Sequence, residues 1–287
     1  MGPCLRPDCA ARLGGVVNHG EPTYQLRLPT VAVWREPGVL QVGLDADAVV
    51  LEGVGELATE AVNHLHSPMT VTELAHRLPG IEPDLTRRLC AHLSSAGLLA
   101  TEPAPPAASV AVLGQSPLAD AVAHALIRAQ VRCHRLPDDA VADRCDPHAL
   151  VVVATATVEP DRVVLARLRS AGRSYLVVRL EPSRAVVGPL VLAEEPGCVH
   201  CDDLVHAEHD PAWARLLDQL CRLAVTPDPG LLSWAVASAV NQVRAWQGGA
   251  ASELHNRCLA VSAPGFAQSV RHWRAQPSCW CAGPGAD

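Results

Sequence analysis

The chain has 287 residues, of which 49% are hydrophobic and 18% charged, and its formal net charge is −7. This length suits two domains, and the negative charge argues against a general nucleic-acid binder, which needs basic surface to displace counterions. All 23 basic residues are arginine. No apolar run reaches the length of a membrane-spanning helix, about 18 residues, and no signal peptide opens the chain. We therefore expect a cytoplasmic protein that binds neither nucleic acid nor a membrane.

Residues 1–24 show no periodicity, and we expect a flexible lead-in there. Between residues 25 and 100, three short strands precede three amphipathic helices. The strands flank the turn signal Glu36-Pro37-Gly38 and continue at Ala48–Leu51. Apolar residues at helical spacing define the helices, over about 57–65, 74–78 and 85–93. Three strands followed by three helices predict a small winged-helix-like α+β module.

The proline- and alanine-rich segment 101–109 predicts a linker. From residue 110 on, strands alternate with helices, which is typical of βαβ units and predicts an α/β, Rossmann-like domain over 110–287 with a mostly parallel sheet. We expect strands at 110–113, 131–136, 150–154, 175–180 and 184–192. We expect helices at 118–129, 163–168, 212–223 and 231–246, and a final hairpin over 254–261 and 266–273.

Four of the eleven cysteines form two close pairs, Cys198-x-x-Cys201 and Cys279-x-Cys281. Paired cysteines are the usual way in which a chain presents four thiolates to one zinc ion, so we expect a structural Zn²⁺ here. Two unrelated pairs, or a thioredoxin-like redox CxxC, are the alternatives. The polar residues within and just after the first pair are expected at the surface or around the metal rather than on it: His200, Asp202, Asp203, His206 and His209.

The turn after strand 110–113 is where a dinucleotide-binding fold carries the motif GxGxxG. Here the sequence reads Gly114-Gln115-Ser116-Pro117-Leu118-Ala119, and only the first glycine is present. Gly114 and Ser116 therefore mark a degenerate nucleotide loop, and a tight strand-to-helix turn is favoured over a phosphate site. We expect neither bound ATP nor catalytic residues.

The first domain is acidic, because residues 25–102 contain five arginines and ten acidic residues, a net charge of 5 − 10 = −5. A DNA-bound helix does not suit such a domain, whereas an exposed strand edge can accept an extended peptide. We expect the peptide to pair with the third strand at Val49, Val50 and Leu51. It would also meet Arg88 and His92, which lie four residues apart on the third helix. In the alternative interpretation, Arg88 and His92 are ordinary solvated residues.

The second domain resembles the ThiF-type activating-enzyme fold, whose members adenylate the carboxyl termini of ubiquitin-like proteins. The resemblance covers about residues 109–283. It rests on Val-Ala-Val-Leu-Gly at 110–114, Val187-Gly188-Pro189, Pro196-Gly-Cys-Val-His-Cys201, the helix from Trp234 to Trp246, and Cys279-Trp-Cys281. With the first domain added, the whole chain resembles the bacteriocin-biosynthesis cyclodehydratase family. These proteins are leader-peptide-binding partners of YcaO proteins in thiazole/oxazole-modified peptide pathways.

The resemblance implies two partners, a precursor leader peptide and a YcaO-type protein, and leaves a homodimer open. Adenylating members of the ThiF fold place a Gly-rich loop, a lysine and an arginine on the ATP phosphates, and a magnesium-binding aspartate after a central strand. This chain has no lysine, and Ala154-Thr155-Ala156-Thr157 follows that strand. The leading hypothesis is a non-catalytic binding and scaffold protein. The rival is an ATP-dependent adenylyltransferase acting on a peptide or carrier-protein carboxyl terminus, and a third alternative is a scaffold for another protein.

Overall fold

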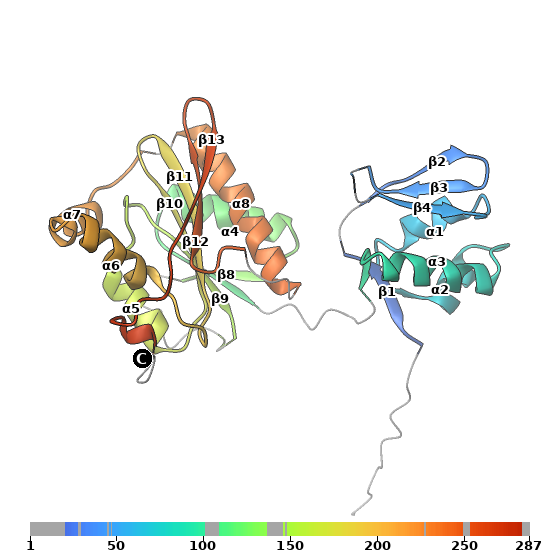
Figure 1. Ribbon diagram of the computed structural model, residues 1–287, viewed down its shortest axis with the longest axis horizontal. Coiled ribbons are helices and arrows are strands. Elements are labelled where there is room, and N and C mark those ends of the chain that lie inside the picture. Colours follow the sequence, from blue (N-terminus) through green and yellow to red (C-terminus); the bar gives the residue numbers. More distant parts are fainter. Residues whose placement is uncertain are drawn as a thin grey trace, which may run out of the picture. The chain divides into compact units, whose positions relative to one another are not determined.

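The computed structural model describes residues 21–27, 30–44, 46, 48–100, 109–136, 146, 148–226, 228–248 and 253–282. The chain forms two compact units, Met1–Ala104 and Pro105–Asp287 (Figure 1). Most of the expected lead-in and all but Ser109 of the expected linker lie outside the described residues. Within the described ranges, none of the helices combines the length and the apolarity that crossing a membrane requires.

The first unit contains the antiparallel sheet that the sequence predicts. The strands β2 (Ala32–Glu36), β3 (Val39–Val42) and β4 (Val49–Glu52) follow one another in this order, so β4 lies at an edge. The turn between β2 and β3 contains Gly38 at a φ of +83°, a conformation that glycine adopts without steric cost.

A second small sheet in this unit was not predicted. The strand β1 (Thr23–Leu26) lies between β5 (Met69–Thr70) and β6 (Leu99–Ala100) and pairs antiparallel with both. The strands β5 and β6 have two residues each, which is too short for a pattern of alternating polarity to be visible in the sequence.

Three helices share one apolar core with these sheets: α1 (Ala58–His64), α2 (Val71–Arg77) and α3 (Pro83–Ser95). The helix α2 begins with a capping box. Thr70 Oγ1 accepts a hydrogen bond from the backbone N–H of Glu73 at 3.1 Å, and the Glu73 carboxylate accepts one from Thr70 N–H at 2.8 Å.

The second unit is built on a seven-stranded sheet in the order β13-β12-β11-β10-β9-β7-β8. The strands β7 to β10 are parallel to one another, whereas β11, β12 and β13 are each antiparallel to the strand before them in this sheet. The sheet is therefore mixed, and the prediction of a mostly parallel sheet holds for β7 to β10 but not for the antiparallel strands β11 to β13. The tight connection from β10 to β11 is too short for the crossover that a parallel pair needs. The strands are β7 (Val110–Leu113), β8 (Cys133–Leu136), β9 (Leu150–Ala154), β10 (Tyr175–Leu180), β11 (Arg184–Val191), β12 (Arg257–Ser262) and β13 (Ala267–His272).

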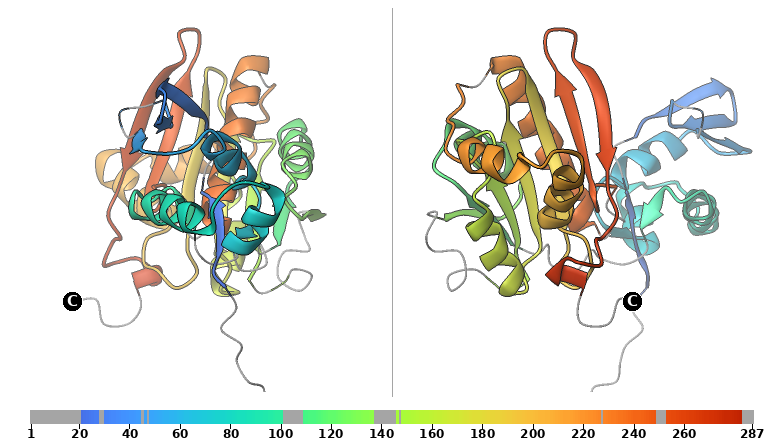
Figure 2. Two further views of the ribbon diagram at one scale, coloured as in Figure 1. Left: turned by 90° about the vertical axis from the view of Figure 1, so that its right-hand side faces the viewer. Right: turned by 60° about the vertical axis from the view of Figure 1, so that its left-hand side comes forward.

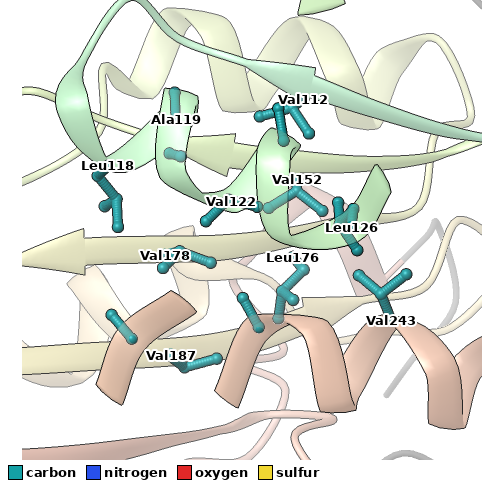
Figure 3. Packing of buried hydrophobic residues seen from close by; sticks show 14 of the residues in the cluster. Val112, Leu118, Ala119, Val122, Leu126, Val152, Leu176, Val178, Val187 and Val243 are labelled. Atoms are coloured by element: carbon teal, nitrogen blue, oxygen red, sulfur yellow. The ribbon is translucent and has the colours of Figure 1, made fainter. Parts of the chain in front are cut away.

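Helices cover both faces of this sheet (Figures 1 and 2). The helices α4 (Pro117–Arg128) and α8 (Pro229–Gln247) lie on one face, and their buried side chains are all valine, leucine or alanine (Figure 3). The helices α5 (Arg162–Ser170) and α6 (Val199–His209) lie on the other. The helix α7 (Trp213–Leu220) follows α6 and buries none of its residues fully. The helix α6 was not predicted, because the segment after Cys198 was interpreted through its cysteine spacing alone.

Candidate metal centre and peptide groove

The first cysteine pair lies at the beginning of α6. Cys198 is the N-cap residue, and Cys201 stands in the first turn, where its N–H donates to the Cys198 carbonyl at 3.1 Å. Three residues apart at a helix start, the two sulfurs point to the same side. Gly197 before them has a φ of +107°, and a Cβ there would lie 1.8 Å from the Asn256 side chain. Only glycine fits this close approach, so Pro196-Gly197 fixes the path of the chain into the pair.

The second pair is brought to the first by the β12–β13 hairpin, as the sequence predicts. After β13, the buried Trp273 donates its indole N–H to the Cys198 carbonyl at 3.2 Å. Its backbone N–H donates to Asn256 O at 3.1 Å. These contacts hold the segment that ends with Cys279 and Cys281 against the start of α6.

The four cysteine sulfurs form one buried cluster. They all lie within 4.8 Å of one another, with 3.7 Å between the Sγ atoms of Cys198 and Cys279 and 3.3 Å between those of Cys201 and Cys281. Four sulfurs at about 2.3 Å from one zinc ion in a tetrahedron would be about 3.8 Å apart. The cluster is therefore compatible with one tetrahedral metal ion.

Backbone groups and burial set the electrostatics of this cluster. The N–H groups of Gly197 and Gln276 point at the sulfurs of Cys281 and Cys201, each at 3.4 Å. The hydrogen bond with Cys198 lowers the pKa of Cys201 to about 4, whereas burial raises the pKa of Cys279 to about 12. Four thiolates therefore cannot share this buried space by themselves, and a divalent cation would supply the missing positive charge.

The aspartates after the first pair are buried rather than at the surface. Asp203 accepts two hydrogen bonds from the Arg162 guanidinium, at 2.8 and 2.9 Å, and one from the Trp213 indole at 3.2 Å. Arg162 also pairs with Glu159 at 3.0 Å, and Asp202 pairs with Arg271. Burial lowers the pKa of Arg162, but the hydrogen bonds and charges of Asp203 and Glu159 outweigh it and raise the pKa. This network joins α5, α6, α7 and β13, and the sequence did not predict it.

The histidines stay off the sulfur cluster. His206 stacks on Trp213 with 4.2 Å between ring centroids, and His200 and His209 are exposed.

In the loop at the start of α4, the Ser116 side chain bonds to backbone groups of the helix start and of the end of β9. Ser116 is the N-cap residue, and its hydroxyl accepts from Ala119 N–H at 3.0 Å and donates to Ala154 O at 3.1 Å. A Cβ at Gly114 would lie 2.1 Å from Ala154 O. The helix N-terminus, which binds phosphate in nucleotide-binding loops, is therefore already occupied by a buried serine.

A groove of about 320 Å³ lies between β4 and α3 in the first unit. Val50 and Leu51 of the strand and Arg88 and His92 of the helix line it together with Glu52, Gly53, Val54, Leu85 and Leu89. The structure thus places four of the five residues predicted for a peptide site around one groove, and Val49 on the same strand beside it.

No protein-family model matches the chain, and a search of curated proteins finds no match. Solved structures do match. The heterocyclase TruD has a TM-score of 0.61 and 16% identity over 90% of this chain and 42% of its own. A heterocyclase in complex with substrate and cofactor has the same TM-score of 0.61 and 16% identity, over 88% of this chain and 38% of its own. E. coli MccB with AMPCPP and SeMet MccA has a TM-score of 0.53 and 13% identity, over 91% of this chain and 99% of its own.

These similarities define the fold. The structural neighbours are a heterocyclase and a microcin biosynthetic enzyme, so the resemblance to proteins of bacteriocin biosynthesis is confirmed at the level of the fold. The chain spans less than half the length of the two heterocyclase chains and nearly the whole of MccB.

Proposed function

We propose that the first unit binds the leader segment of a precursor peptide. The second unit would be a zinc-stabilised scaffold for a YcaO-type cyclodehydratase that makes thiazole or oxazole rings. The groove between the edge strand β4 and the helix α3 carries this proposal. A leader bound there would extend the sheet as a further strand, as peptides do in β-strand addition.

The groove has the parts that such binding needs. The edge of β4 offers main-chain hydrogen bonds, and Leu51, Leu85 and Leu89 offer an apolar wall. Arg88 and His92 are exposed, and they place basic groups at the groove in a domain whose net charge is negative. His92 donates from Nδ1 to the Arg88 carbonyl at 2.9 Å, so Nε2 is the ring nitrogen left for the peptide. An apolar leader with a nearby acidic residue fits this chemistry.

In the second unit, Cys198, Cys201, Cys279 and Cys281 would hold a structural Zn²⁺ that ties the end of the chain to α6. A scaffold role is supported by the closed loop at Ser116, and by the hydroxyls after β9, which bond within their own segment. With Ser116 capping the start of α4 and no lysine in the chain, the lysine that adenylating members of the ThiF fold place on the ATP phosphates has no counterpart here.

An ATP-dependent adenylyltransferase remains the second candidate, because the MccB structure that this chain resembles over 91% of its length contains AMPCPP. Pyrophosphate exchange separates the two. The scaffold proposal expects no exchange above background with any leader or carrier peptide, and robust exchange would favour the enzyme.

Leader binding is tested by fluorescence anisotropy on the full chain, with a labelled leader from a Cys/Ser/Thr-rich precursor encoded beside the gene. We expect Arg88→Glu to weaken binding about tenfold, about 1.4 kcal/mol, by placing a negative charge beside an acidic leader. The matched control is Arg87→Glu, because Arg87 lies on the same helix, pairs with Asp84 and does not line the groove. Equal affinities of the two variants for a leader that binds the wild type would contradict the proposed groove.

A further inference from the structure

A pocket of about 150 Å³ lies between α5 and α6, beside the cysteine cluster, and is called the α5/α6 pocket below. Besides these two helices, the short 3₁₀ helix Trp280–Ala282 contributes to it, and Figure 1 shows this short helix beside α5. The pocket is smaller than a typical cofactor site, which measures about 300 to 1,000 Å³. Its size therefore suits a single side chain or a ring of similar volume.

The free polar group of the α5/α6 pocket is the hydroxyl of Tyr175, the first residue of β10. The side chain is 1% exposed, yet no hydrogen bond joins its hydroxyl to any residue that the structure describes. The hydroxyl is not among the polar atoms sealed inside the protein, so it borders on the space of the pocket. Because a buried hydroxyl without a partner destabilises a fold, this group points to a partner from outside the chain.

The charged residues at the pocket already have partners. Arg162 donates to Asp203, to Glu159 and to the Pro160 carbonyl, and Asp203 also accepts from the Trp213 indole. An ionic ligand would have to break this network before it could pair with either charge. Burial raises the pKa of Tyr175, so its hydroxyl stays neutral, and the pocket fits a neutral ligand.

The remaining walls favour a flat ring. Leu165 and Ala166 of α5 and Val199 of α6 are apolar, and the Trp280 side chain completes the pocket. Trp280 is 51% exposed, although the cysteines on both sides of it are buried. A partly exposed tryptophan at the rim of a pocket is typical of protein interfaces, where it provides a large contact area.

The pocket is also held in one shape. The cysteine cluster fixes the start of α6 and the segment with Trp280, and the bonds from Arg162 to Asp203 join α5 to α6. Walls that do not have to be ordered on binding cost little conformational entropy, so even a small pocket can contribute to affinity.

We propose that the α5/α6 pocket receives one tyrosine side chain of a partner protein. The ring would lie against Trp280 and Leu165, and its phenol would hydrogen-bond to the Tyr175 hydroxyl. Each of two phenols can be donor or acceptor, whereas a phenylalanine would leave Tyr175 unpaired. The proposal rests on the scaffold role of the second unit, and it uses no residue of the leader groove.

The first test compares p-cresol and toluene, which reproduce the side chains of tyrosine and phenylalanine. Both are titrated into the full-length, zinc-loaded chain with ¹⁵N-labelled tryptophan, and Trp280→Phe assigns the Trp280 indole resonance. We expect p-cresol to shift this resonance to saturation and to bind about fivefold more tightly than toluene. Tyr175→Phe should remove the difference. A Trp280 resonance that p-cresol leaves in place, or equal affinities for the two compounds, would overturn the proposal.

The second test fills the pocket. Ala166 is half-buried at the pocket, so Ala166→Leu should occupy it, and Val163→Leu on the same helix is the control because Val163 does not line it. The partner is the YcaO-type protein encoded beside the gene. We expect Ala166→Leu and Trp280→Ala to weaken this complex at least about tenfold, and Val163→Leu to leave it unchanged.

Zinc content and leader affinity, measured on the same three variants, should stay at the wild-type level. Leader affinity separates this proposal from that of the leader groove, which Arg88→Glu tests on the first unit. A wild-type chain that does not bind the YcaO-type protein, or an Ala166→Leu variant that binds it as the wild type does, would overturn the docking pocket.

Discussion

The two faces of the seven-stranded sheet are built on different chemistry. Under α4 and α8 the buried side chains are valine, leucine and alanine alone. Under α5 and α6 the same sheet buries five thiols, the indole of Trp273, and the carboxylates of Glu159, Asp202 and Asp203. The first face depends on the area that it removes from water, and the second depends on each polar group keeping its partner.

The two faces of the sheet should therefore differ in how well they tolerate substitutions. An aliphatic face tolerates exchange of one apolar residue for another of similar volume. A face with buried thiols and charges does not, because removing one member leaves the others unpaired in a low-dielectric space. The α5/α6 face therefore fixes where the segment with Cys279 and Cys281 lies, and with it the position of β13.

The largest effect is expected at the metal centre. Structural zinc contributes about 10 to 16 kcal/mol in zinc-finger peptides, as much as the whole stability of a typical domain. We expect about one zinc per chain by metal analysis. Cys201→Ser should lose the zinc and most of the cooperative thermal unfolding of the second unit. Cys258→Ser is the control, because Cys258 is buried on the same face but lies outside the cluster. A Cys201→Ser variant with full zinc content and unchanged unfolding would contradict the assignment.

On the aliphatic face, Leu126→Ala should cost about 3 to 5 kcal/mol in urea unfolding, since Leu126 is fully buried and leaves a cavity. Zinc content should stay at the wild-type level, because no polar partner is lost. Loss of zinc from Leu126→Ala would show that the metal site on the α5/α6 face depends on packing of the aliphatic face, which contradicts their independence.

A smaller effect is expected from Arg162→Met in the ion-pair network. Breaking a fully buried pair costs about 3 to 5 kcal/mol, and we expect about 2 to 3 here because the Arg162 side chain is 23% exposed. Arg167→Met on the same helix is exposed and should cost less than about 0.5 kcal/mol. Adding Asp203→Leu to Arg162→Met should recover part of the loss, and strict additivity of the two substitutions would argue against coupling.

The sequence predicted the elements with strong local patterns. Continuous apolar runs gave β7, β9 and β10 with the bounds that the structure has, and the proximity of the cysteine pairs was indicated by their spacing alone. The strand-to-helix turn at residues 114–119 was also expected, and Ser116 caps the helix that follows it.

The rest depends on contacts between distant residues. Whether β11 is parallel or antiparallel to β10 is decided by the length of one connection, and β1 is a strand only because two-residue partners flank it. The Arg162–Asp203 pair joins residues 41 apart, and neither position shows by itself that it will be buried. Periodicity reports which face of an element is apolar, but not which charges meet beneath a helix.

Hydrogen–deuterium exchange on the full chain, with the leader peptide and separately with ATP and magnesium, distinguishes a peptide-binding scaffold from an adenylating enzyme. We expect the leader to slow exchange in β4, over Val49–Glu52, and along α3, and we expect ATP to change nothing over residues 114–119 at the start of α4. Protection of 114–119 by ATP, together with a leader that leaves β4 and α3 unchanged, would contradict the scaffold proposal.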